Sequence, residues 1–349
     1  MSISEKLLII AQNEQKVYDA GFEAGKSQGG DTTEAFLAGK KAEYDKFWDS
    51  YQQNGNLKNY KYSFAGKGWN TDVFYPKYDI IPTSAESMFS GFNGTAFSLT
   101  QRLEELGKTM DLSSVTESAA NAFYESPFTE IPYLNLGNAT TITRIFYCCG
   151  NLVTTGLTIN STHALTRLFD NCYALKNLTV GGTIGQNGFD VHWSKNLSKE
   201  SLISILTACN KQNIDKTITL TLPNKCIDGA TDTATLLANY DGKIEYTIPV
   251  EVTNSLNLKH KKIIPGSVCI YPLDAAGNYA NPEWTDDGNG NIKYQMGDLE
   301  IQVGTIDYET GVLSASIYPN ELLRKIKIQY TIQNPYTNAI ANNYTIAFA

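Results

Sequence analysis

Residues 142–159 read ITRIFYCCGNLVTTGLTI, and residues 165–182 read LTRLFDNCYALKNLTVGG. The two stretches align at a spacing of 23 residues, and residues 119–136 add a further copy in front of them. The positions that match in all three copies are apolar: Ala119, Ile142 and Leu165; Phe123, Phe146 and Phe169; and Leu134, Leu157 and Val180. Two more positions match in the later copies: Cys149 with Cys172, and Leu152 with Leu175. A fixed period in the twenties indicates one short unit that stacks on copies of itself.

Each copy combines an apolar turn with a short alternating strand, such as Leu157-Thr158-Ile159. One copy cannot bury its apolar positions alone, whereas stacking joins them into columns of Leu, Phe and Cys. We therefore expect a short leucine-rich-repeat solenoid. Alternate strand residues point away from the core, which makes the outward strand face a candidate binding surface formed by Tyr133, Asn135, Thr158 and Thr179. The alternative is a solvated sheet face without a ligand.

Residues 1–56 are expected to form an N-terminal helical, coiled-coil assembly region. The apolar seam of its first helix consists of Ile3, Leu7, Ile10 and Val17. Helices this short are marginal alone in water, so we expect the chain to self-associate through them, with a trimer favoured over a dimer. The alternative is an amphipathic helix that packs on its own chain.

Residues 57–250 are expected to form the leucine-rich-repeat domain with its caps, including an inserted helix around Leu99–Leu106. Residues 251–349 contain short strands separated by Gly and Asn turns, a pattern typical of an antiparallel β-sandwich. The expected fold class is therefore α+β multidomain, with N-terminal helices, a short solenoid and a C-terminal sandwich.

Charge and composition limit the function classes. The net charge of −8 leaves no basic patch for nucleic acid. No apolar segment reaches the ~18–20 residues needed for membrane insertion, and the first residues lack a signal peptide's organisation, which predicts synthesis in a cytoplasm. The six cysteines show no CxxC spacing, so buried thiols are favoured over disulfides or a metal site.

No catalytic, cofactor-binding or metal site is expected. Asp287, Asn289 and Asn291 alternate like calcium ligands, but the loop lacks the glycine and glutamate of a calcium-binding loop, and a hairpin turn explains the same residues. The three histidines, His163, His192 and His260, are far apart in the sequence and lie near no carboxylate or cysteine motif.

Longer phrases carry a family likeness. The repeat unit resembles the BspA-type leucine-rich repeat. The phrases "IAQNEQKVYDAGFEAGK", "KKAEYDKFWDSYQQNG" and "LSKESLISILTACN" are similar to repeat proteins encoded by phages and prophages of Gram-positive, Clostridia-like bacteria. The C-terminal "WTDDGNGNI" and "GTIDYETGVL" resemble a β-domain of phage virion proteins.

This resemblance implies a non-enzymatic virion component, associated with a tail, fibre or baseplate. The expected partners are copies of itself, other virion proteins, and a glycan or protein of the host surface. A BspA-like cell-surface or secreted adhesin is the alternative, and a glycan depolymerase assembled from distant carboxylates is a third hypothesis.

Overall fold

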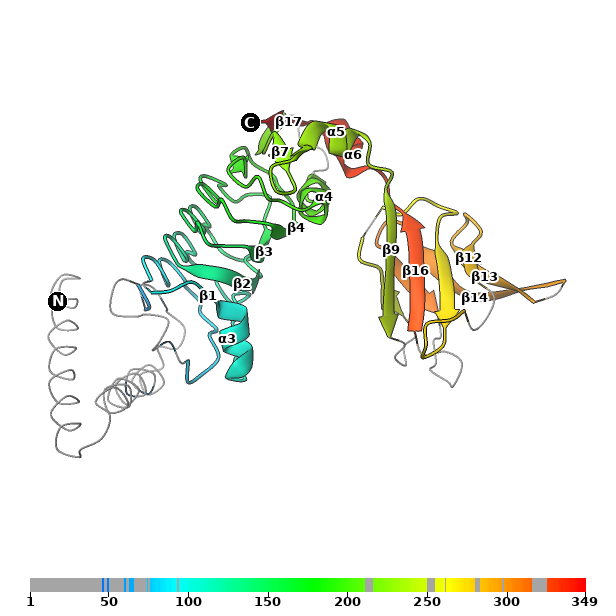
Figure 1. Ribbon diagram of the computed structural model, residues 1–349, viewed down its shortest axis with the longest axis horizontal. Coiled ribbons are helices and arrows are strands. Elements are labelled where there is room, and N and C mark those ends of the chain that lie inside the picture. The colour runs from blue at the N-terminus through cyan, green and yellow to red at the C-terminus, as the bar shows by residue number, and fades with distance from the viewer. Residues whose placement is uncertain are drawn as a thin grey trace, which may run out of the picture. The chain divides into compact units, whose positions relative to one another are not determined.

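The computed structural model describes residues 46, 49, 60, 63–65, 74, 76–92, 94–210, 216–249, 255–260, 262–279, 283–296, 298–315 and 325–349. The chain divides into two compact units (Figure 1). The first unit runs to Leu236 and includes Ala339–Ala349, and the second is Leu237–Asn338. The predicted seam of Ile3, Leu7, Ile10 and Val17 lies outside the described residues.

The first unit contains a four-stranded parallel sheet in the order β1-β2-β3-β4. Its strands are β1 (Phe97–Ser98), β2 (Phe128–Leu134), β3 (Thr154–Ile159) and β4 (Asn177–Gly182). Every β3 residue pairs with the β4 residue 23 positions later, from Thr154 with Asn177 to Ile159 with Gly182. Tyr133 and Leu134 of β2 pair with β3 at the same spacing. The 23-residue period of the sequence is thus the register between β3 and β4 and between the end of β2 and β3.

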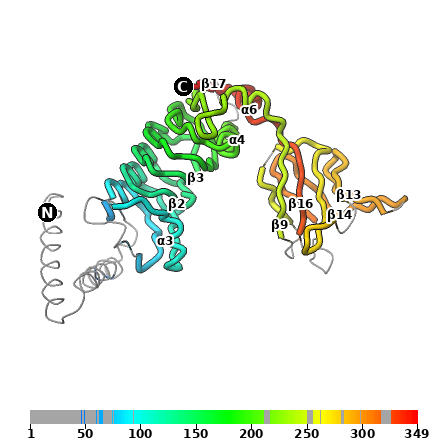
Figure 2. The backbone as a smooth tube through the Cα atoms, viewed as in Figure 1, coloured from blue at the N-terminus to red at the C-terminus, as the bar shows by residue number. Residues whose placement is uncertain are grey.

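A second ladder joins the turns that precede the strands (Figure 2). The Phe123 amide donates to the Ile145 carbonyl at 2.9 Å, and the Phe146 amide donates to the Leu168 carbonyl at 3.1 Å. Arg144 and Arg167, again 23 residues apart, adopt positive φ angles of 56° and 55°. The left-handed conformation is uncommon for residues with a side chain, and here it recurs because each turn follows the backbone of its neighbour.

Phenylalanine rings form a column between the sheet and the turns. The Phe146 ring stacks on Phe123 at 5.8 Å and on Phe169 at 5.3 Å between centroids. The stacked members of the column are fully buried: Phe64, Phe89, Phe123, Phe146 and Phe169. Phe189 then packs against Phe169 with its ring tilted by 61°, at the end of the column. Burial of these large rings makes a substantial apolar contribution to the stability of the repeat.

The buried thiols run beside this column. Cys149 Sγ donates to the Phe123 carbonyl at 2.9 Å, and Cys172 Sγ donates to the Phe146 carbonyl at 3.1 Å. All six cysteines lie in described parts of the chain, and each is a free thiol. Burial raises the pKa of the Cys149 thiol to about 11. These cysteines act as small packing residues that also satisfy backbone carbonyls.

Helix α4 (Lys199–Thr207) closes the open edge of β4. Ser198 caps its N-terminus by accepting from the Ser201 amide. The Ser201 and Ser204 hydroxyls accept hydrogen bonds from the Leu178 and Val180 amides, both at 2.8 Å. An exposed edge strand presents unpaired backbone groups that another chain can pair with. The two serines remove that edge by occupying the place of a fifth strand.

The remaining sheets of the first unit are small. β5 (Phe189–Asp190), β6 (Ile218–Leu222) and β17 (Tyr344–Phe348) form a parallel sheet in the order β17-β6-β5. β7 (Lys225–Cys226) pairs with β8 (Thr231–Asp232). Helix α3 (Leu99–Glu105) follows β1 directly, so the predicted inserted helix is confirmed. The chain passes between the units in α5 (Thr233–Ala238) and α6 (Pro335–Ala341).

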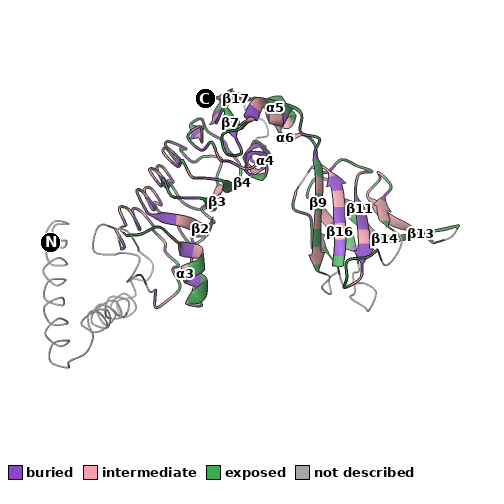
Figure 3. Ribbon diagram, viewed as in Figure 1, coloured by how far each residue is buried: buried purple, intermediate pink, exposed green. Residues whose placement is uncertain are grey.

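The second unit is built on one eight-stranded antiparallel sheet in the order β10-β15-β14-β13-β12-β11-β16-β9. Its strands are β9 (Lys243–Pro249), β10 (Leu256–Asn257), β11 (Cys269–Leu273), β12 (Trp284–Asp286), β13 (Asn291–Met296), β14 (Leu299–Asp307), β15 (Val312–Ala315) and β16 (Lys325–Thr331). Ile326, Ile328 and Tyr330 alternate along β16 as buried residues, whereas β9 at the sheet edge alternates between half-buried and exposed (Figure 3).

The expected fold class is wrong. The described residues are mostly β and 12% helical, arranged as parallel sheets and a large antiparallel half-barrel instead of the expected solenoid and sandwich. Apart from residues 46 and 49, the region predicted to form N-terminal helices lies outside the described residues. The strands predicted to form two packed sheets instead join one continuous curved sheet. The alternation of apolar and polar residues does not distinguish the two architectures, because a strand buries one face in a sandwich and in a half-barrel alike.

The predicted boundary at residue 250 also differs from the observed one. Strand β9 lies within the predicted repeat domain, but all seven of its residues pair with β16 in the second unit. Strand β17 lies within the predicted sandwich, but it pairs with β6 in the first unit. Both strands pair with partners far away in the sequence, and short-range patterns carry no information on such pairing.

Replacing Phe146 with alanine should destabilise the first unit by about 3–5 kcal/mol, because the cavity opens in the middle of the ring column. Chemical denaturation of the full chain measures this change. Tyr173→Ala is the matched control, since Tyr173 is 52% exposed and an exposed substitution should cost under about 1 kcal/mol. Equal effects of the two substitutions would show that the column is not the core.

Replacing both Ser201 and Ser204 with alanine should cost about 1–3 kcal/mol for each β4 amide that loses its acceptor. Thr207→Ala, on the same helix, is the control, because Thr207 donates only to the Ile203 carbonyl within the helix. Hydrogen exchange should then be faster at the Leu178 and Val180 amides. Unchanged protection at these two amides would mean that the serines do not close the edge.

Candidate functional site

The outward face of the four-stranded sheet carries the predicted binding residues. Leu134 and Leu157 are buried, whereas Tyr133, Asn135 and Thr179 are exposed. Thr158 is half-buried on the same face. The strand alternation thus directs all four candidate residues away from the core, as the period of two requires. Whether this face binds a ligand stays a prediction.

Tyr133 is held in place on this face by two glycines. A Cβ atom at Gly156 would lie 2.5 Å from Tyr133 Cδ2, and one at Gly181 would collide with the Tyr133 hydroxyl. The hydroxyl lies 2.8 Å from Thr158 Oγ1, within hydrogen-bond distance. The ring therefore lies over the β3 and β4 backbones and remains 47% exposed. This arrangement gives the sheet a fixed aromatic surface.

Polar side chains on the strands of this sheet bond to one another between neighbouring strands. Ser98 Oγ donates to Glu130 Oε2 at 2.7 Å, and Asn177 Nδ2 donates to Thr154 Oγ1 at 3.2 Å. These bonds link β1 to β2 and β3 to β4. The face is thus a preorganised surface whose polar groups hold each other in position.

A second cluster lies on the turn side of the first unit. The Tyr124 and Tyr147 rings stack at 5.3 Å with an interplanar angle of 4°, and the Arg167 guanidinium lies 5.9 Å from the centre of the Tyr147 ring. Tyr173 and Trp193 meet edge to face at 5.7 Å. Sequence analysis missed this cluster, although the spacing of 23 residues from Tyr124 to Tyr147 was a signal for it.

Charged groups accompany these rings. His192 Nδ1 lies 2.6 Å from Asp190 Oδ1, which also accepts from the His192 amide at 2.9 Å. Arg167 Nε lies 3.8 Å from Asp170 Oδ2. Burial raises the pKa of Asp170, and the negative charge of Asp190 raises it further. His192 therefore belongs to a cluster of charged and aromatic groups.

The other two histidines have structural partners. His163 is buried, with Nδ1 3.1 Å from the Asn160 amide and Nε2 2.7 Å from the Ala139 carbonyl. Burial lowers its pKa. His260 Nδ1 lies 3.0 Å from the Tyr330 hydroxyl, and burial lowers its pKa too. Both rings are thus held by hydrogen bonds within the fold.

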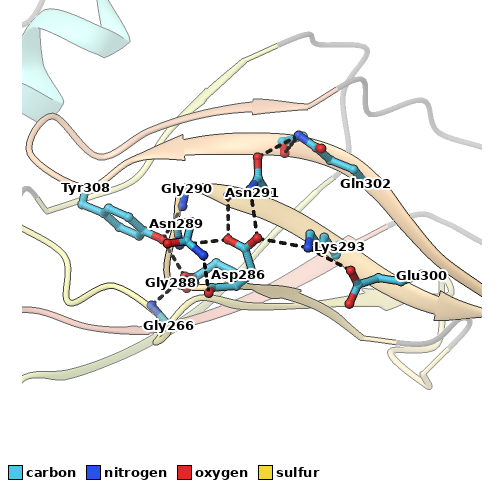
Figure 4. A network of polar contacts seen from close by, with 12 residues as sticks. Gly266, Asp286, Gly288, Asn289, Gly290, Asn291, Lys293, Glu300, Gln302 and Tyr308 are labelled. Atoms are coloured by element: carbon cyan, nitrogen blue, oxygen red, sulfur yellow. Dashed lines mark hydrogen bonds and ion pairs between the residues drawn. The ribbon is translucent and has the colours of Figure 1, made fainter.

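The loop from Asp286 to Asn291 is a hairpin between β12 and β13 (Figure 4). Asp286, only 8% exposed, accepts from the Gly266 and Val268 amides at 2.6 Å each. It also accepts from the Tyr308 hydroxyl at 2.7 Å. Burial and the Asp286 carboxylate raise the pKa of Tyr308 to about 12. A buried carboxylate with this many donors is a structural anchor for the loop.

Asp287 is the residue that the calcium hypothesis needs as first ligand. Its oxygens accept from Asn291 Nδ2 and the Asn289 amide at 2.9 Å each, and Lys293 Nζ lies 3.1 Å away. The hydrogen bond from Asn291 is the main reason why the pKa of Asp287 is low. The Asp287 carboxylate, which a cation would need as a ligand, is thus already bonded to donors of its own loop and to the ammonium group of Lys293.

Comparisons with protein-family models, curated proteins and solved structures find no match for this chain. Within the described ranges, no three His, Cys, Asp or Glu side chains are grouped to hold a metal ion. The described helices include none that is long and apolar enough to cross a bilayer.

The fit between Tyr133 and Gly181 predicts a double-mutant cycle. Gly181→Ala should displace the Tyr133 hydroxyl and cost about 0.5–1.5 kcal/mol through the lost Thr158 hydrogen bond. In the Tyr133→Phe background the colliding oxygen is absent, and the next nearest atoms to the new Cβ lie 3.5 and 3.6 Å away. The added cost should therefore vanish there. Denaturant melts of the four proteins measure the cycle, and equal costs in both backgrounds would contradict it.

Proposed function

We propose that the chain is a non-enzymatic structural protein of a bacteriophage virion, associated with its tail, fibre or baseplate. It displays β surfaces that attach to other virion proteins or to the host surface. The phrases that resemble phage-encoded proteins support the virion assignment. The outward sheet face around Tyr133 supports the attachment role.

The observation that carries the attachment role is the fixed position of Tyr133. Its ring rests on Gly156 and Gly181, and its hydroxyl is bonded to Thr158. Binding through a flexible surface loses side-chain entropy, and a side chain that is already ordered avoids part of that loss. An exposed aromatic ring with a bonded hydroxyl suits a partner that contributes both apolar and polar contacts.

Self-association through the N-terminal seam belongs to the same proposal. A virion attachment protein gains avidity when several copies present the same surface. Replacing Leu7 and Ile10 by aspartate in the full chain would place charge in the seam. Light scattering should then show monomers where the unmodified chain forms trimers or dimers.

The test of the virion assignment is mass spectrometry of particles from an induced lysogen that encodes this chain. After separation on a density gradient, the chain should sediment with the capsid and tail proteins. Its recovery in the culture supernatant or on the cell wall, apart from particles, would instead support the adhesin alternative. The same gradient fractions, stained with an antibody against the chain, locate it on the particle.

A further inference from the structure

We propose that the turn side of the first unit binds a neutral carbohydrate chain. The site, called the turn face, consists of Tyr147, Arg167, Tyr173, Asp190, His192 and Trp193. Backbone hydrogen bonds in the 23-residue register join the turn of Tyr147 to the turn of Arg167. The turn of Asp190, His192 and Trp193 adjoins Tyr173 through the contact of Trp193 with the Tyr173 ring and through a hydrogen bond from Asn196 Nδ2 to the Tyr173 carbonyl. The turn face is separate from the outward sheet face that carries Tyr133.

Two exposed rings provide the apolar part of the turn face. Tyr173 is 52% exposed and Trp193 is 39% exposed, and the two rings meet edge to face. The Tyr173 hydroxyl donates to Asn171 Oδ1 at 2.7 Å, which fixes the ring. A sugar ring has an apolar face of C–H groups that packs on an aromatic ring. A fixed pair of exposed aromatic rings suits such a ligand better than it suits solvent.

Polar side chains lie beside the aromatic rings. The His192 ring lies 4.5 Å from the Trp193 ring and is bonded to Asp190. Carboxylate, imidazole and guanidinium groups together offer both acceptors and donors. Sugar hydroxyls need both, since each one donates and accepts. Few well-placed polar groups beside apolar surface are the usual composition of a small-ligand site.

The charge balance of the turn face selects a neutral ligand. In the turn face and next to it, Arg144 and Arg167 supply two positive charges, and Asp170 and Asp190 supply two negative ones. Arg144, Arg167 and Asp190 each act electrostatically on the Asp170 carboxyl group. A phosphate-rich polymer would meet the carboxylates, and the chain carries a net charge of −8. A polycation would meet the arginines. A neutral, hydroxyl-rich chain meets neither penalty.

The inference names the ligand class for the host-surface role in the proposed function. Its test uses purified protein and asks nothing about virions. Absence of the chain from particles would therefore leave a positive sugar-binding result intact. A failure to bind sugars would leave the virion assignment intact.

The experiment titrates the full chain with soluble tetrasaccharides of glucose, N-acetylglucosamine, galactose and mannose. Binding is followed by tryptophan fluorescence and by calorimetry. At least one of these sugars should bind, and Trp193→Ala and Tyr173→Ala should each weaken it by about tenfold or more. Trp193→Phe should recover part of the affinity. Tyr279→Ala, an exposed tyrosine of the second unit, should bind like the unmodified chain.

Thermal melts by circular dichroism show whether each variant remains folded. His192→Gln, which keeps a hydrogen-bonding side chain, serves as a second variant if Trp193→Ala melts early. Inorganic polyphosphate is the competing ligand. The inference is overturned if no sugar binds at millimolar concentration. It is also overturned if folded turn-face variants bind like the unmodified chain, or if polyphosphate binds in place of the sugars.

Discussion

The 23-residue register between neighbouring turns is the constraint on which the first unit depends. It sets the pairing of β3 with β4 and, on the other side of the core, the stacking of Phe146 on Phe169. One inserted residue within a copy would break one ladder or the other. The longer interval from Phe89 to Phe123 is tolerated because it contains α3, which follows β1 and leaves the Phe stack intact.

Sequence periodicity predicted the structure that depends on contacts between neighbouring repeat copies. It missed the pairing of strands that lie far apart in the sequence. The buried Phe and Cys positions and the strands of the repeat follow from local pattern. The pairing of β17 with β6 and of β9 with β16 does not, because nothing near Tyr344 or Lys243 specifies a partner strand. The predicted fold class was wrong for this reason: strand alternation reveals a buried face but not the sheet that covers it.

The same distinction between local and long-range contacts applies to the two candidate surfaces. The outward direction of Tyr133 followed from period-two alternation, but its seat on Gly156 and Gly181 required the observed register. The turn face was missed because its members are adjacent only after stacking. His192 looked isolated among motifs, yet its partners are Asp190, two residues earlier, and Trp193, the next residue. Contacts between residues so close in the sequence could have been predicted from it, whereas the contact of Trp193 with Tyr173 could not.

Core positions and outer turn positions of the repeat are under different physical constraints in this chain. Core positions such as Phe123, Phe146 and Phe169 must repeat, because each ring packs on the next and a smaller side chain would leave a cavity. Outer turn positions have no such requirement. Tyr124 and Tyr147 repeat and stack, but the next position in that series is Asp170. The tyrosine stack therefore stops where charged groups begin, beside Asp190 and His192. A unit whose core is fixed by its period can change its chemistry only at such outer positions, and there the turn face acquires its mixed aromatic and charged character.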